Sequence, residues 1–99
     1  MTPCLLTLIT SPSLEEAMID WLLMQTEISG FSTSKIDGHG AREKSYSALE
    51  QVTGRQKKLQ FVVHTETTIA AELVAQLKQK FKNTGLHYYI TPIIEFGSV

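Results

Sequence analysis

Hydrophobic and polar positions follow two different periods in the first third of the chain. Residues 4–10 (CLLTLIT) are almost wholly apolar or β-branched and stop at a Ser-Pro pair, which is typical of a buried strand. From Leu14 to Leu22, apolar residues recur at helical spacing and form one stripe. Ser13 and Glu16 stand three positions apart at the start of that stripe, so the sequence predicts a helix that begins with a capping box.

The middle of the chain contains a weak strand, an irregular segment and a clear strand. Residues 30–37 (GFSTSKID) are rich in Ser and Thr, which favours a partly exposed strand. Residues 38–56 show no sustained period, although residues 46–53 are compatible with a short helix. Apolar positions then alternate from Leu59 to His64, which predicts a strand. We expect residues 38–56 to form one long loop, and long loops are usually functional or disordered.

The last third of the chain predicts a second helix and a final strand. Thr67 or Thr68 is expected to cap the helix, along which large apolar residues recur every four positions. An Asn-Thr-Gly turn predicts its end. Residues 86–96 (LHYYITPIIEF) are aromatic and β-branched, as in a strand. Pro92 places that strand at a sheet edge or at a bulge, because proline cannot donate a hydrogen bond to a ladder.

The predicted order of elements is β-α-β-β-α-β. Two helices with apolar stripes on one face of a four-stranded antiparallel sheet make a ferredoxin-like α+β fold. A chain of 99 residues suffices for one domain, which spans residues 1–99 in this interpretation. This fold hosts many functions, so function has to be argued from particular residues.

Composition excludes several classes of protein. The single cysteine, Cys4, rules out an internal disulfide, and the formal net charge of −1 argues against nucleic acid as a partner. No apolar run approaches the roughly 18 residues that cross a bilayer, and the N-terminus lacks a signal-peptide pattern. We therefore expect a cytoplasmic protein without membrane insertion, which needs no cofactor for folding. No Ser-His-Asp arrangement or pair of catalytic carboxylates stands out, so we expect no enzymatic activity.

The near-zero net charge conceals an uneven distribution. Residues 1–37 carry five acidic residues against one lysine, a net charge of −4. Residues 38–58 carry five basic residues against two acidic ones, a net charge of +3, and Arg55 and Lys58 lie where the chain returns to the sheet. Two interpretations remain open for this stretch. It is a surface for an anion or an acidic partner, with Arg55 and Lys58 as ligands, or a solvated loop whose charges serve solubility.

Motifs spread over the whole chain resemble a known family. The stretch GFSTSKIDGHGARE is similar to the second strand and loop start of PII nitrogen regulatory proteins, and KKLQFVVHTE is similar to their third strand. The motifs LLTL, GF, GHG, GRQ and YYITPIIEFG together resemble a small bacterial family of PII-like proteins without assigned function. The glycine-lysine phosphate loop that follows the second helix in PII proteins is absent here, since the Asn-Thr-Gly turn leads directly into the last strand.

This resemblance implies a homotrimer whose edge strands and loops meet in clefts between subunits. PII proteins bind adenine nucleotides in these clefts and press their long loop onto a membrane transporter or an enzyme, so the resemblance implies a regulatory or sensor protein. Carried over by position, Gly38, His39, Gly40 and Arg42 fall where the loop would contact phosphates. A small ligand would order the loop and so change what it docks against.

Two other functions stay open. The chain is also similar to the trimeric CutA proteins linked to divalent-metal tolerance, and PII-like members are associated with heavy-metal efflux systems, which would then supply the partner. In that case His39, His64 and His87, with Cys4, would bind the metal, because imidazole is a good ligand for zinc, copper and nickel. No two histidines have ligand spacing in the sequence, so the site would be assembled in three dimensions or between subunits. The third alternative is a non-catalytic module that contacts another protein through its sheet edge.

Overall fold

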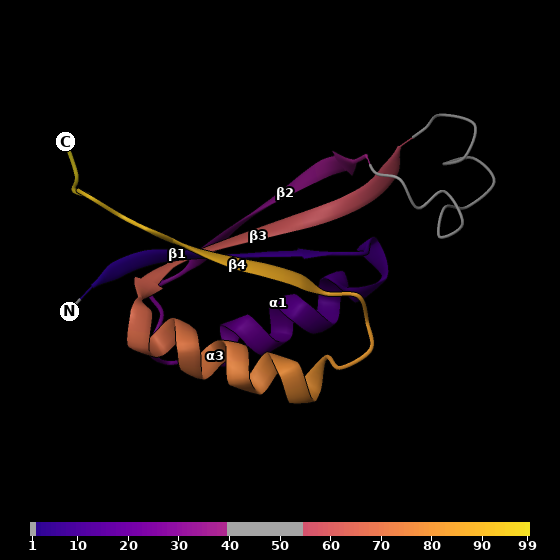
Figure 1. Cartoon of the computed structure of the whole chain (residues 1–99), viewed down its shortest axis with the longest axis horizontal. Coiled ribbons are helices and arrows are strands. Elements are labelled where there is room, and N and C mark those ends of the chain that lie inside the picture. The colour runs from indigo at the N-terminus through magenta and orange to yellow at the C-terminus, as the bar shows by residue number, and fades with distance from the viewer. Residues whose placement is uncertain (1, 40–54) are drawn as a thin grey trace.

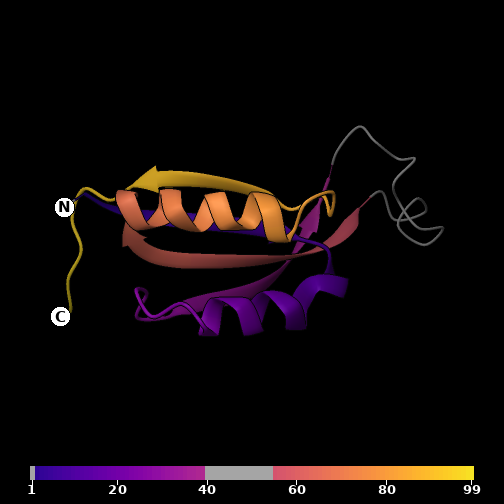
Figure 2. The same ribbon diagram turned by 90° about the horizontal axis from the view of Figure 1, so that it is seen from below.

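The computed structural model describes residues 2–39 and 55–99. The elements in chain order are β1 (Pro3–Thr10), the 3₁₀ turn η1 (Pro12–Leu14), α1 (Glu15–Leu23), β2 (Phe31–Gly38), β3 (Gln56–Glu66), α3 (Thr67–Lys80) and β4 (His87–Pro92). The four strands form one antiparallel sheet in the order β2-β3-β1-β4, and both helices cover the same face of it (Figures 1 and 2). The predicted ferredoxin-like fold is therefore confirmed, while the short helix considered for residues 46–53 lies outside the described residues.

The ends of the strands differ from those predicted. β2 runs to Gly38 and β3 begins at Gln56, and these two residues form the last rung of the ladder. The segment that joins the two strands is therefore residues 39–55. β4 lies at a sheet edge, as Pro92 indicated, and it ends at this proline instead of continuing to residue 96. One further bond follows, from the amide of Ile93 to the carbonyl oxygen of Pro3 (3.1 Å).

The core lies between the sheet and the helices. Because side chains alternate along a strand, every second residue of β1 and β3 points toward the helices. Leu6, Leu8, Phe61 and Val63 take these positions and are completely buried. The helices contribute their apolar stripes, and the rings of Trp21 and Phe81 meet edge to face at 6.1 Å. The alternating residues of the strands and the apolar stripes of the helices thus pack into one core. The core residues that come from the helices are Met18, Trp21, Leu22, Ala70, Leu73, Val74 and Leu77.

Both predicted helix caps are wrong. Residue 14 precedes α1, and its amide already donates to the carbonyl oxygen of Ser11 (3.2 Å), so a 3₁₀ turn leads into the helix. Ser13 instead places its hydroxyl 2.9 Å from that of Ser11. At α3, Glu66 is the N-cap residue, and the amide of Thr67 donates to the carbonyl oxygen of Thr2 (2.9 Å). Neither helix start has a side-chain cap, and at each one a backbone carbonyl accepts from an amide at or just before the first helical residue.

The predicted stop after α3 is confirmed. Asn83 and Gly85 have positive φ angles of 64° and 80°, which glycine and asparagine tolerate best. The hydroxyl of Thr84 donates to the carbonyl oxygen of Phe81 at 2.6 Å. The chain can therefore leave the helix sharply and enter β4.

The sheet face that points away from the helices is largely apolar at its centre. Leu5 and Ile9 of β1, Val62 of β3 and Tyr89 of β4 lie there, because each is offset by one position from a helix-facing residue. Tyr89 is 44% exposed and the other three are partly exposed. Within residues 2–39 and 55–99, no helix is long and apolar enough to span a membrane.

Candidate functional site

The ends of β2 and β3 bring several of the predicted ligand residues together. Gly38 is the last residue of β2 and His39 follows it, while Arg55 directly precedes β3. The side chain of Lys58 lies across Gly38, since a β-carbon at Gly38 would be 3.4 Å from Lys58 Cγ. Figure 1 shows this end of the β2-β3 hairpin projecting away from the helix layer, at the opposite end of the sheet from both chain termini. The other two predicted residues, Gly40 and Arg42, lie outside the described part of the chain.

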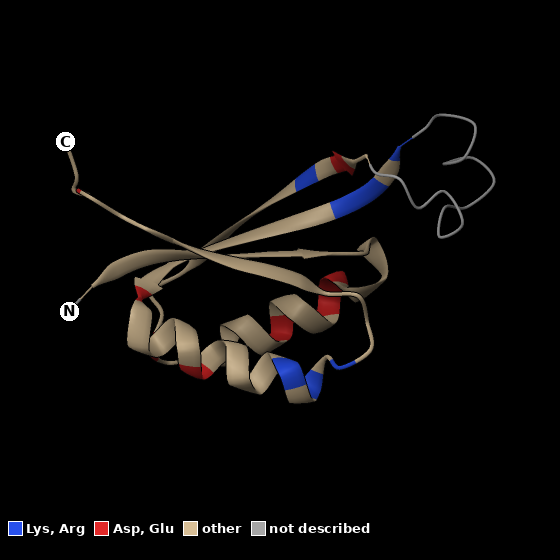
Figure 3. Cartoon of the chain, in the orientation of Figure 1, with Lys and Arg blue, Asp and Glu red and all other residues tan. Residues whose placement is uncertain are grey.

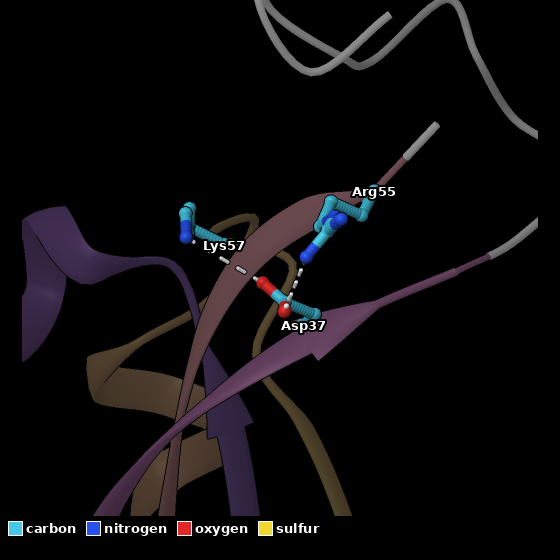
Figure 4. Close-up of polar contacts among 3 residues, drawn as sticks. All are labelled: Asp37, Arg55 and Lys57. Carbon is cyan, nitrogen blue, oxygen red and sulfur yellow. Dashed lines mark hydrogen bonds and ion pairs between the residues drawn. The ribbon is translucent and has the colours of Figure 1, made fainter. Parts of the chain in front are cut away.

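Asp37 is a residue of this site that the sequence analysis missed. Arg55 Nη1 donates to Asp37 Oδ2 at 3.2 Å, and Lys57 Nζ lies 3.7 Å from Asp37 Oδ1. Figure 4 shows Arg55 and Lys57 on either side of the carboxylate, each facing a different oxygen. The contact follows from the strand register, because Asp37 and Lys57 are direct partners across the ladder. Asp37 lies two residues before the connecting segment 39–55, and Lys57 lies two residues after it. Opposite charges placed symmetrically about the segment are the sequence signal for this pair.

A cavity of about 370 Å³ opens beside these residues, between the hairpin and the start of α1. We call it the hairpin pocket. Both charged and apolar residues of the two strands line it. The lining residues are Pro12, Glu15, Lys35, Ile36, Asp37, Lys57, Lys58 and Leu59.

Cations outnumber anions around the hairpin pocket. Lys35, Lys57 and Lys58 line it together with Asp37 and Glu15, and Arg55 adjoins it through its bond to Asp37. The side chain of Lys58 lies across Gly38, on the opposite face of the hairpin from Asp37 and Lys57, so three cations face two carboxylates, a local surplus of one positive charge. Figure 3 shows the same clustering, with basic positions toward the ends of both strands and an acidic position at the end of β2. A pocket of this charge attracts anions.

The three histidines are not brought together in one chain. His64 of β3 pairs with Leu5, and His87 of β4 pairs with Ile9, so the two histidines lie about four β1 residues apart, roughly 13 Å along the sheet. His39 follows the end of β2, and His64 meets the ring of Phe96 edge to face at 4.7 Å. Among the described residues, no group of three or more His, Cys, Asp or Glu side chains is placed to hold a metal ion. A histidine site between subunits stays a prediction.

Cys4 is a poor candidate for the fourth metal ligand. It is fully buried on the helix side of the sheet, whereas His64 and His87 lie on the other side. Burial, and to a smaller extent the negative charge of Glu66, raises the pKa of the Cys4 thiol. The protonated thiol is thereby favoured over the thiolate that binds metals.

The chain is similar in structure to proteins from three bacteria. A DUF3240 family protein from Shewanella baltica matches with a TM-score of 0.80 and 24% identity, over 100% of this chain and 98% of that chain. CPII from Thiomonas intermedia, a nitrogen regulatory PII-like protein solved with ADP, AMP and bicarbonate, matches with a TM-score of 0.71 and 13% identity, over 100% and 98% of the two chains. A protein from Thermus thermophilus described as a candidate PII-like signalling protein matches with a TM-score of 0.66 and 13% identity, over 93% and 87%. These likenesses establish a PII-like fold.

Comparison of sequences gives the family. No curated protein matches this chain. The model of the DUF3240 family, which is described as a protein of unknown function, matches residues 1–99. The predicted relation to PII-like proteins of unassigned function is therefore confirmed, and the chain belongs to the DUF3240 family.

Proposed function

We propose that this chain is a non-catalytic, PII-like regulatory protein that binds a small anionic ligand in the hairpin pocket and acts as a homotrimer. The observation that carries this proposal is the excess of cations over carboxylates around a cavity large enough for a small molecule. The structurally similar CPII was solved with ADP, AMP and bicarbonate, all of which are anions. We expect an adenine nucleotide to be the ligand, held through its phosphates.

The residues of the pocket suit phosphate oxygens. Arg55 presents a planar guanidinium, which binds oxyanions through two parallel N–H bonds, while Lys35 and Lys57 add compact charges. Pro12 and Leu59 provide apolar contact area in the same cavity. Phosphates would therefore meet the charged side chains, and less polar parts of the ligand would meet the apolar ones.

The open sheet face supports the oligomer. Monomeric proteins rarely leave a broad apolar sheet face uncovered, and here Leu5, Ile9 and Val62 form such a face between the two ends of the sheet. All six residues of β4 are exposed, and none of them carries a formal charge, so this edge has little protection against pairing. A ring of copies would cover both features. The membrane transporter or efflux protein that the family resemblance implies as a partner stays a prediction.

Replacing Lys35, an exposed lysine that lines the hairpin pocket, with glutamine tests the ligand site. Isothermal titration with ADP is expected to show an affinity lower by about tenfold or more, because a hydrogen bond to a charged group contributes about 1.5–3 kcal/mol. Lys82→Gln is the matched control, since Lys82 is also an exposed lysine but follows α3, away from the hairpin. Equal losses in both variants, or no binding by the wild type, would refute the proposed site.

A further inference from the structure

We propose that Asp37 is a built-in competing anion, which occupies the cations of the hairpin pocket and restricts the pocket to ligands with two or more negative charges. This inference rests on the proposed function. It assigns a specificity-determining role to a residue that would not itself be expected to bind an anion.

The carboxylate of Asp37 contacts the cations in the way that a bound anion would. Its two oxygens each face one cation, Arg55 at 3.2 Å and Lys57 at 3.7 Å, as the two oxygens of a phosphate or a carboxylate would (Figure 4). The strand ladder holds the carboxylate there, since Asp37 and Lys57 are paired residues. A tethered group of this kind acts at a high effective concentration, so a free anion has to compete with it.

The contacts are weak enough to be exchanged. The side chains of Asp37, Arg55 and Lys57 are 36%, 49% and 71% exposed, so water screens their attraction. Exposed ion pairs of this type contribute little to folding stability. The pair can therefore open toward a better ligand without loss of the fold.

The charge of the ligand decides the competition. A singly charged anion would only replace the charge of Asp37 with an equal one, without the advantage of the tether. A multiply charged anion also brings charge for Lys35, which lines the pocket and forms no ion pair with the described residues. The favoured chemistry is thus a multiply charged oxyanion, such as a diphosphate.

Removing the charge of Asp37 is the direct test. Isothermal titration at low ionic strength with inorganic pyrophosphate is expected to show about tenfold tighter binding by Asp37→Asn than by the wild type, a change of the size that the loss of one competing charge gives. Asp37→Glu should keep the wild-type affinity, because the competing charge remains. Combined with Arg55→Gln, the gain from Asp37→Asn should shrink, because the contested cation is gone. Thermal unfolding verifies that each variant is folded.

The outcomes separate this inference from the proposed function. Pyrophosphate binding that Lys35→Gln weakens but Asp37→Asn leaves unchanged would refute the role of Asp37 while the anion site stands. Weaker binding by Asp37→Asn would also refute it, since Asp37 would then position the cations for the ligand. In the wild type, sulfate should displace pyrophosphate and acetate at equal ionic strength should not. Equal displacement by both would contradict the charge threshold, and no pyrophosphate binding by any variant would overturn both proposals.

Discussion

Replacing Phe61 with alanine is expected to lower the free energy of unfolding by about 3–5 kcal/mol, the usual cost of removing a buried phenylalanine. Phe61 is completely buried near the middle of β3, between Leu8 of β1 and Thr33 of β2. Its ring also lies 6.3 Å from that of Phe31, so the substitution removes an aromatic contact as well as apolar area. Native domains have about 5–15 kcal/mol of stability in total, so the substitution removes a large share of it.

Urea denaturation at fixed protein concentration measures this effect, because an oligomer makes stability depend on concentration. Gln79→Ala is the control, since Gln79 is exposed on α3 and lies outside both the core and the open sheet face. It should change the free energy of unfolding by no more than about 0.5 kcal/mol. A loss of similar size in both variants would contradict the place of Phe61 in the core.

Replacing Val62 with glutamate is expected to dissociate the assembly into monomers. Val62 lies on the open sheet face beside Thr7, which is only 4% exposed even in the single chain. A carboxylate at this position would be buried between copies without a partner, and an unpaired buried charge costs several kcal/mol. In a free chain the same side chain would point into solvent, so the monomer should remain folded.

Light scattering coupled to size-exclusion chromatography measures the mass, and circular dichroism verifies the fold. Gln76→Glu introduces the same side chain on an exposed position of α3, on the helix layer instead of the open sheet face. The wild type and Gln76→Glu should elute as trimers and Val62→Glu as a monomer. A wild type that is monomeric, or a Val62→Glu variant that stays trimeric, would exclude the open sheet face as the interface.

Most of the fold could be predicted because it depends on local periodicity. Alternation in β1 and β3 and helical spacing in α1 and α3 are properties of short stretches, and they determined the order of elements and the faces that form the core. The caps could not be predicted in the same way. The acceptor for Thr67 is the backbone of Thr2, more than sixty positions earlier in the sequence, and a backbone acceptor leaves no residue signature.

The cations of the candidate site could be predicted from the sequence, but its carboxylate, Asp37, could not. Clustered basic residues pointed to Arg55 and Lys58, because net charge along a stretch is visible in the sequence. Asp37 was counted with the acidic first third of the chain, yet the register places it opposite Lys57. That pairing depends on where the hairpin closes, which the irregular segment between the strands does not reveal. The separation of the histidines could not be predicted either, because it depends on the register that places His64 and His87 at different points along β1.

The central claim is that the hairpin pocket is the ligand site, and amide chemical-shift mapping by NMR tests it most directly. On titration with ADP, the amide signals that move in proportion to saturation should be those of Asp37, Arg55, Lys57 and Lys58. The amides of Lys78, Lys80 and Lys82 form the internal comparison, since these residues make a second basic group at the end of α3. Shifts centred on the hairpin would support the account. Shifts centred on the end of α3, or an unchanged spectrum at high ADP concentration, would contradict it.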